Sequence, residues 1–390
     1  MRERETSLLS IFMISLRLGL TSFGGPIAHL AFFRQEYVER RRWLKEKEYA
    51  DLVALAQFIP GPASSQVGMG IGLLRGGLLG AFISFLGFTL PSVVVLMVFA
   101  LALQSYGLAD AGWIQGLKVV AVAIVAQALI GMGRNLAPDR NRATIAVLTI
   151  IVLLVWQTVF SQVVLIAAAG AAGYILYKGK ANESTTPMPV PLSKKTGAGF
   201  LAGFAGLLVI LPLLRPLVNT WWFDMWDSFY RAGALVFGGG HVVLPLLERE
   251  VVPAGLVTAD EFLAGYGMAQ AVPGPLFTFA SYLGTAASGI PGGILATAAI
   301  FLPAFLLIAG VLPFWNTARQ NRSMQGALYG INACVVGILA AAFYDPIFTS
   351  AVQSSIEAAL AVLLFGLLVF WKAKPWVVVL AGALLGQLLL

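Results

Sequence analysis

Residues 17–25 read RLGLTSFGG and residues 231–239 read RAGALVFGG, so one motif is written twice in the chain. Each copy is followed by two glutamates at matching positions, Glu36 and Glu48 or Glu250 and Glu261, and then by a Gln-x-x-Pro-Gly-Pro segment, at residues 57–62 and 270–275. The copies are 214 residues apart at the first segment (231 minus 17) and 213 apart at the second (270 minus 57). One deleted residue accounts for this register, so the sequence predicts two homologous halves.

The composition is that of a membrane protein. Of the 390 residues, 59% are hydrophobic and 11% are charged, whereas a soluble domain carries about 25% charged residues. Several stretches of about 18 residues or more carry no charge, which is long enough for a helix to cross the hydrocarbon core. The net charge of +7 matches basic cytoplasmic loops and requires no nucleic-acid partner. We predict an all-α polytopic membrane protein embedded in the lipid bilayer.

Few residues suit metal binding or covalent chemistry. Cys334 is the only cysteine, so an intrachain disulfide and a cysteine metal cluster are excluded. The only histidines are His29 and His241, so we expect no zinc site built from them. We find no nucleophilic triad, phosphate-binding loop or cofactor motif, so we expect no cofactor and no enzymatic activity. The N-terminal segment lacks a small-residue cleavage signature, and we expect it to be retained.

Helix breakers interrupt the apolar segments that carry the repeated motif. Residues 8–33 are interrupted at Phe-Gly-Gly and residues 48–74 at Pro-Gly-Pro. We interpret each as a re-entrant hairpin, and with the second half this gives four hairpins and about nine full spans. An alternative interpretation counts some hairpins as crossings. Residues 34–47 are predicted to form an amphipathic interfacial helix, and residues 78–103 a long helix kinked at Pro91.

The distribution of basic residues sets the orientation of the two halves. Residues 34–47 hold six Lys and Arg, whereas the matching residues 248–261 hold one Arg among four acids. The positive-inside rule puts the first stretch, with the N-terminus, in the cytoplasm and the second outside. The repeat is therefore predicted to be inverted. The predicted organisation is a first membrane half at residues 1–178, a cytoplasmic linker at 179–196 and an inverted second membrane half at 197–390.

The breaks are candidate anion sites. A broken helix leaves backbone N–H groups free at the start of the following half-helix, and the positive end of the helix dipole adds to them. Glycines in the breaks let the backbone approach a ligand closely. The alternative for each break is a tight hairpin without a ligand. Paired broken segments in two inverted halves favour a substrate site at their interface.

Polar side chains near the breaks extend these candidate sites. Arg17 and Arg231 are intramembrane cations whose planar fork suits an oxyanion; the alternatives are snorkelling or pairing with Glu36 and Glu250. His241 is either a proton-linked group or a packed structural histidine. Glutamines and hydroxyls beside the Pro-Gly-Pro segments are candidate donors. The candidate substrate-binding residues are Arg17, Phe23, Gly24, Gly25, Gln57, Pro60, Gly61, Pro62, Ser64, Ser65, Arg231, Phe237, Gly238, Gly239, Gly240, His241, Gln270, Pro273, Gly274, Pro275 and Thr278.

The repeated Phe-Gly-Gly, the repeated Gln-x-x-Pro-Gly-Pro and the Gly-rich helix that follows resemble the chromate transporter family in its long, two-domain form. The resemblance covers nearly the whole chain, most specifically residues 17–91 and 231–303. It implies export of chromate across the bacterial inner membrane, resistance to chromate, and sulfate as a structural analogue and competitor. The first half reads Phe-Gly-Gly-Pro and the second Phe-Gly-Gly-Gly, so we expect the two sites to differ.

The leading hypothesis is therefore a secondary transporter that exports chromate, a tetrahedral dianion, by alternating access. The first alternative is a transporter for sulfate or another oxyanion. The second is an anion channel, which would use the same helix N-termini. A membrane enzyme is disfavoured because no acid–base pair is present. The sequence is compatible with a monomer and with a homodimer.

Overall fold

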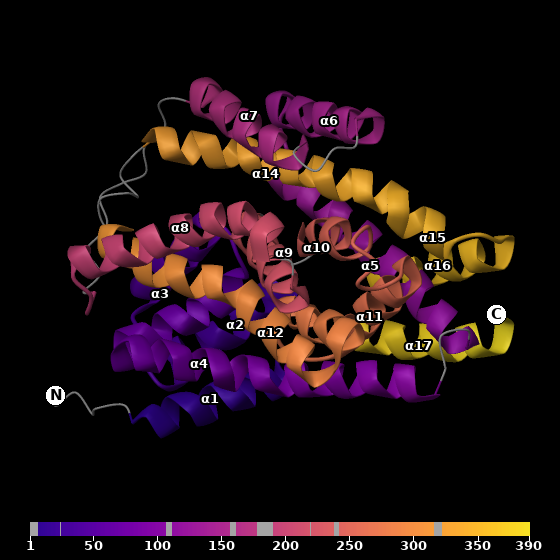
Figure 1. The fold of residues 1–390 in the computed structure, drawn as a ribbon, viewed down its shortest axis with the longest axis horizontal. Coiled ribbons are helices and arrows are strands. Elements are labelled where there is room, and N and C mark those ends of the chain that lie inside the picture. Colours follow the sequence, from indigo (N-terminus) through magenta and orange to yellow (C-terminus); the bar gives the residue numbers. More distant parts are fainter. Residues whose placement is uncertain are drawn as a thin grey trace. The chain divides into compact units, whose positions relative to one another are not determined.

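A computed structural model describes the chain at residues 7–23, 25–106, 111–156, 161–177, 190–218, 220–237, 242–315 and 322–390. Every regular element in these ranges is helical (Figure 1). Five of the described helical segments are long and apolar enough to cross a membrane, at Ala63–Ser105, Gly112–Leu136, Lys194–Val218, Leu276–Phe314 and Gln325–Ala351. The predicted fold class, an all-α polytopic membrane protein, is confirmed.

The chain forms two compact units, and each unit draws on both repeats. The first unit comprises Met1–Val98, Ser184–Gly240 and Val272–Arg319. The second comprises Phe99–Glu183, His241–Ala271 and Gln320–Leu390. The Phe-Gly-Gly and Pro-Gly-Pro breaks of the first repeat therefore belong to the same unit as the Pro-Gly-Pro break of the second.

The first segment of unit one folds back on itself. Helix α1 (Leu8–Thr21) is followed by α2 (Gly25–Phe33), which continues into a π-helix (Arg34–Arg40). The hydroxyl oxygens of Ser15 in α1 and Tyr37 in the π-helix lie 3.4 Å apart. This contact brings the two arms together, as a hairpin that turns at the Phe-Gly-Gly break requires.

The second segment folds back in the same manner. Helix α3 (Glu46–Phe58) is followed by the Pro-Gly-Pro break and by α4 (Ala63–Tyr106). The guanidinium of Arg75 in α4 donates to the backbone carbonyl of Trp43, which precedes α3. The two ends of this segment are thus joined, and the break lies at the far end of the hairpin.

Helices α4 and α12 (Phe279–Val311) each contain a sharp turn. Gly77 has φ 62° and ψ −155°, and Gly289 has φ 66° and ψ −163°. Positive φ is accessible to glycine without steric cost, which explains the residue type at both turns. The turn in α4 lies at Gly76 and Gly77, between the predicted segments of residues 48–74 and 78–103, and Pro91 lies within the helix.

The basic stretch after α2 also differs from the prediction. Instead of one amphipathic helix over residues 34–47, the helix ends at Arg40, and Arg42 takes a positive φ of 53°. The carboxylate of Glu36 accepts hydrogen bonds from Arg41 at 2.6 Å and from Arg40 at 3.2 Å. These ion pairs hold the basic chain against the end of the hairpin.

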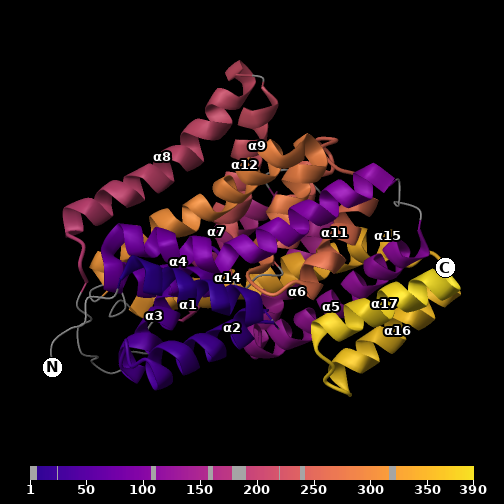
Figure 2. The same cartoon turned by 90° about the horizontal axis from the view of Figure 1, so that it is seen from below.

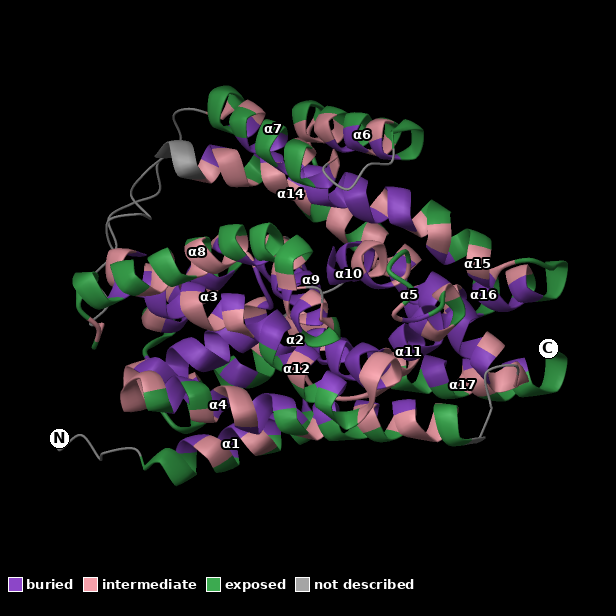
Figure 3. Ribbon diagram, in the orientation of Figure 1, coloured by how far each residue is buried: buried purple, intermediate pink, exposed green. Residues whose placement is uncertain are grey.

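The remainder of unit one is built mainly from three helices that pack together. Helices α8 (Lys194–Val218) and α9 (Trp221–Leu235) pack against α12, and Figure 2 shows α8 and α9 joined end to end. A core cluster that includes Leu211 of α8 and Tyr230 of α9 lies between them. The rest of α8 is mostly exposed (Figure 3) and apolar, as expected for a helix that faces lipid.

Unit two consists of helices that meet through glycine contacts. Its described helices of nine or more residues are α5 (Gly112–Leu136), α6 (Arg140–Val155), α7 (Ser161–Leu176), α10 (Val243–Val251), α11 (Ala259–Ala271), α14 (Arg322–Ala342), α16 (Ser355–Val369) and α17 (Pro375–Leu389). Helix α14 packs on α6 and α7, and α5 packs on α11, α16 and α17. Gly116 of α5 abuts the backbone of Gly382 in α17. Small residues at such contacts are typical of membrane helices.

Candidate functional site

In unit one, backbone hydrogen bonds join the breaks of the two repeats, and we call this pair of contacts the crossing. The N–H of Gly61 donates to the carbonyl oxygen of Val236 at 2.7 Å. The N–H of Gly274 donates to the carbonyl oxygen of Ser22 at 3.0 Å. Ser22 and Val236 each precede the phenylalanine of a Phe-Gly-Gly triplet, so the two hydrogen bonds join equivalent positions. Each Pro-Gly-Pro segment is therefore bound to the Phe-Gly-Gly segment of the other repeat.

Glycine is required at both donors. Gly61 has φ +123° and Gly274 has φ +106°, a conformation that side-chain-bearing residues rarely adopt. A Cβ atom at Gly61 would lie 2.7 Å from the side-chain nitrogen Nε2 of Gln66. A Cβ atom at Gly274 would overlap the hydroxyl of Ser92. That hydroxyl donates to the carbonyl oxygen of Pro273 at 2.5 Å. Packing and backbone conformation both exclude a side chain at the crossing.

Two helix N-termini of the first repeat converge beside this crossing. His29 lies in the second turn of α2 and Ser64 in the first turn of α4, and Nδ1 of His29 is 3.3 Å from the Ser64 hydroxyl. The first N–H groups of a helix have no intrahelical partner and carry partial positive charge. The ring of His29 also packs edge-on against Phe88 at a centroid distance of 5.5 Å. The backbone here is suited to an anion without any charged side chain.

Several buried polar atoms near the crossing have no hydrogen-bond partner within the described part of the chain. They are Nε2 of His29, Oγ of Ser65, Oε1 of Gln66 and Oγ of Ser22. Each of these residues is at most 2% exposed. Buried polar groups are normally hydrogen-bonded, and an unpaired one costs about 1–3 kcal/mol. A cluster of such groups indicates a ligand or water position.

The arginine pair takes two different environments. The Arg231 guanidinium binds the carboxylate of Asp227 through Nε at 3.0 Å and Nη2 at 2.9 Å. Arg215 also contacts this carboxylate, at 3.3 Å. Arg17 is exposed, and Glu36, its expected alternative partner, pairs with neighbouring arginines instead. The guanidinium of Arg231 is therefore paired with Asp227, whereas the side chain of Arg17 is exposed.

The other candidate side chains also differ between the two repeats in burial and hydrogen bonding. Gln57 is exposed, whereas Gln270 is half-buried and its Nε2 has no partner in the described ranges. The hydroxyl of Thr278 donates to the carbonyl oxygen of Pro275 at 2.7 Å and is satisfied. The aromatic rings of Phe23 and Phe237 are half-buried. The candidates that lie outside the described residues are Gly24, Gly238, Gly239, Gly240 and His241.

Sequence reasoning missed His29 and Asp227. His29 was weighed only as a metal ligand, although its place four residues after Gly25 puts it one helical turn beyond the break. Asp227 is four residues before Arg231, the spacing at which side chains meet on one face of a helix. Both signals were present in the sequence as local spacings.

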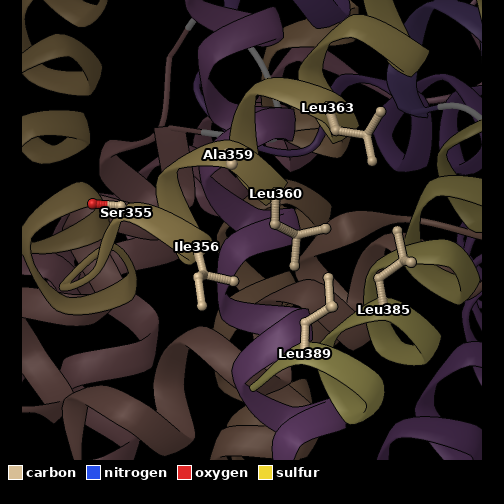
Figure 4. Close-up of a pocket in the computed structure, with 7 residues that line it drawn as sticks. All are labelled: Ser355, Ile356, Ala359, Leu360, Leu363, Leu385 and Leu389. Carbon is tan, nitrogen blue, oxygen red and sulfur yellow. The ribbon is translucent and has the colours of Figure 1, made fainter.

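Unit two contains an apolar surface cleft of about 330 Å³ between α16 and α17 (Figure 4). Ile356, Leu360 and Leu363 line one wall and Leu385 the other, and Ser355 is the one polar lining residue. Such a lining offers an oxyanion almost no donors. The cleft suits an acyl chain, and we do not assign it to a polar substrate.

A family model and several relatives match nearly the whole chain. The model of the chromate transporter family matches residues 9–174 and 223–387. The chain is 26% identical to an uncharacterized transporter of Methanocaldococcus jannaschii, over 100% of this chain and 96% of the relative. It is 28% identical to a chromate transport protein of Pseudomonas aeruginosa, over 97% and 91% of the two chains. A probable chromate transport protein of Synechococcus elongatus is 29% identical over 86% and 84%. No solved structure matches the chain.

Proposed function

Because the chain belongs to the chromate transporter family, we propose that it is a secondary transporter that exports chromate from the bacterial cytoplasm and confers chromate resistance. The observation that carries this proposal is the crossing of the breaks, in which Gly61 binds Val236 and Gly274 binds Ser22. Transporters built from repeats place substrate where broken helices of the repeats meet. The site would lie in the inner membrane, and a transporter role is in keeping with a family of transporters rather than enzymes.

The chemistry at the crossing suits a tetrahedral dianion. Helix N-termini supply N–H donors and partial positive charge, and hydroxyls such as that of Ser65 add further donors. Neutral donors bind a dianion without fixing it as a buried ion pair with a cation, so release remains feasible. Sulfate has the same charge and shape, and we expect it to compete.

The direction of transport follows from the membrane potential. Moving one elementary charge through 100 mV is worth about 2.3 kcal/mol. A dianion that leaves an inside-negative cell therefore gains about 4–5 kcal/mol at that potential. Uptake of the same ion would require a coupled cation, whereas export requires none.

Helix α8 supports the inverted arrangement of the halves. It lies in the segment between the two matched regions, residues 175–222, and so is additional to the repeat. Its 25 residues span about 37 Å at 1.5 Å per residue, more than the hydrocarbon core of about 30 Å. If each repeat starts and ends on the same side of the membrane, one additional membrane-spanning helix between the repeats puts the start of the second repeat on the opposite side. The second repeat is then inverted relative to the first. Together with the charge asymmetry of residues 34–47 and 248–261, this favours a cytoplasmic N-terminus.

Flux measurements on the purified protein in proteoliposomes test the proposal. Vesicles loaded with labelled chromate are given a potential that is negative on the loaded side. We expect saturable efflux that increases with potential, is inhibited by sulfate, and is accelerated by chromate on the opposite side. Flux that is linear in chromate concentration without acceleration would instead indicate an anion channel. Absence of chromate flux together with sulfate flux would assign the protein to the sulfate alternative.

A further inference from the structure

Three buried polar residues beside the crossing belong to the first repeat and have apolar counterparts in the second. His29, Ser64 and Gln66 of the first repeat correspond to Val243, Phe277 and Phe279, by the separations of 214 and 213 residues found for the two segments. Val243, Phe277 and Phe279 are at most 1% exposed. The backbone crossing is thus built by both repeats, but at these three positions the buried polar side chains belong to the first repeat.

The hydroxyls at the remaining pair of positions differ as well. Ser65 corresponds to Thr278. The Ser65 hydroxyl has no partner in the described part of the chain, whereas that of Thr278 is bound to the carbonyl oxygen of Pro275. A donor that is already engaged within its own turn contributes little to an anion. At these four positions the first repeat therefore has polar side chains that are able to bind an anion, whereas the second repeat has apolar or already bonded side chains.

We propose that the transporter has a single oxyanion pocket, formed by the first repeat, in which Nε2 of His29 and the hydroxyl of Ser65 donate to the substrate. This inference rests on the proposed function and deepens it, since it names the specificity-determining side chains. Chromate, sulfate and related tetrahedral dianions are the class of ligand. The second repeat closes the pocket through the hydrogen bond between Gly274 and Ser22, and it has the apolar Val243 at the position that corresponds to His29.

The contact between His29 and Ser64 is compatible with an imidazole that donates from Nε2. Nδ1 of His29 is within hydrogen-bond distance of the Ser64 hydroxyl, which is able to donate or to accept. When that hydroxyl donates to Nδ1, the ring carries its proton on Nε2, and this atom becomes a donor. A neutral imidazole thus acts as a hydrogen-bond donor without adding a buried charge.

Burial explains how the pocket is compatible with transport. His29 is 1% exposed and Ser65 is 2% exposed, so an anion reaches them only when the crossed breaks separate. The hydrogen bonds at Gly61 and Gly274 are the contacts that such a separation would break. Alternating access at a fixed site requires a motion of this kind.

Concentration dependence of chromate flux tests this inference in proteoliposomes. We compare wild type with His29→Ala, His29→Gln and Ser65→Ala, and use Val243→Ala as the matched control in the second repeat. Loss of a hydrogen bond to a charged ligand is expected to raise the half-saturating chromate concentration on the order of tenfold or more in His29→Ala. The maximal rate per inserted protein should change much less. His29→Gln retains an amide donor near the position of Nε2 and should recover most of the affinity.

The outcomes separate the inference from the proposed function. If wild type transports chromate and His29→Ala saturates at the same concentration as Val243→Ala, the single pocket is wrong and the proposed function stands. If wild type carries no oxyanion, the proposed function fails and the pocket with it. If His29→Ala does not accumulate in the membrane, Ser65→Ala serves as the test. Unchanged saturation in Ser65→Ala would then overturn the inference.

Discussion

The amide nitrogen of Gly274 lies 3.0 Å from the carbonyl oxygen of Ser22 and donates a hydrogen bond to it. The two residues are far apart in sequence and belong to different repeats. The same bond recurs between Gly61 and Val236 at 2.7 Å. A backbone bond of this kind does not depend on side-chain chemistry, so it is available in both repeats although their side chains have diverged. It ties the Pro-Gly-Pro break of each repeat to the entry of the other repeat's Phe-Gly-Gly break.

Substitution of the two crossing glycines should abolish transport more than it lowers protein level. In Gly61→Ala and Gly274→Ala the added Cβ meets close neighbours and the backbone is held at positive φ, which costs at least about 1–2 kcal/mol. We expect loss of chromate resistance with normal membrane insertion, measured by growth on chromate and by immunoblot. Gly255→Ala is the matched control, because Gly255 also has a positive φ of 69° but no atom within 4 Å of the added Cβ. Full resistance in both crossing variants would contradict the role of the breaks.

The two repeated arginines should respond differently to substitution. Arg231→Gln weakens the pairing of the fully buried Asp227 carboxylate, and breaking a buried ion pair costs about 3–5 kcal/mol. Arg215 still contacts that carboxylate, so we expect a loss near 3 kcal/mol and a clear fall in the melting temperature of the purified protein. Arg17→Gln changes an exposed side chain and should alter stability by less than about 0.5 kcal/mol.

A double variant separates pairing from anion contact at Arg231. In Arg231→Gln combined with Asp227→Asn the unpaired carboxylate is removed, and we expect much of the lost melting temperature to return. Chromate flux measured in the same preparation shows whether function returns with stability. Restored stability without restored flux would mean that Arg231 also acts on the substrate.

Labelling from the two sides of the membrane should demonstrate the inverted repeat. Single cysteines at Arg41 and Ala254, both exposed, are introduced with Cys334→Ala, which removes the buried native thiol. A membrane-impermeant maleimide applied to intact cells should label the cysteine at position 254 alone. In inverted vesicles it should label the one at position 41. Labelling of both from the same side would show that the halves are parallel.

Asp139 should make a pH-dependent contribution where the start of α6 meets the end of α7. The Tyr177 hydroxyl, at 2.7 Å, and the N–H and guanidinium of Arg142 lower the pKa of the Asp139 carboxyl to about 2. A lowered carboxyl pKa stabilises the fold above the unfolded value of about 3.9, and the contribution is lost as the pH falls toward 2. Tyr177→Phe should therefore lower the melting temperature at pH 7 and have a smaller effect at pH 3.

The size of this effect is limited by solvent. The Asp139 side chain is 40% exposed, so we expect less than about 1 kcal/mol. Tyr344→Phe, which alters an exposed tyrosine, is the control for loss of a hydroxyl. An equal fall at both pH values would mean that Tyr177 acts through packing rather than through the carboxylate.

The sequence predicted the helical class, and the breaks at Phe-Gly-Gly and Pro-Gly-Pro fall between helices at the expected places. These features depend on local composition and on glycine and proline, which act over a few residues. The turn at Gly76 and Gly77 lies at the predicted boundary between residues 48–74 and 78–103, whereas Pro91 lies inside the helix, as a proline can in a membrane helix. The bond between Gly274 and Ser22 was not predictable, because no local pattern specifies which backbone groups meet across the repeats.

Equilibrium binding of chromate to the purified protein, measured by isothermal titration calorimetry, tests the central claim most directly. Wild type should bind one chromate per chain, with sulfate as a competitor, because the proposed donors His29 and Ser65 both belong to the first repeat. The double variant Gly61→Ala with Gly274→Ala should bind chromate at least about tenfold more weakly than Gly255→Ala, at a temperature where both proteins are folded. Unchanged affinity in the double variant, or two equivalent chromate ions per chain, would contradict a single site built at the crossed breaks.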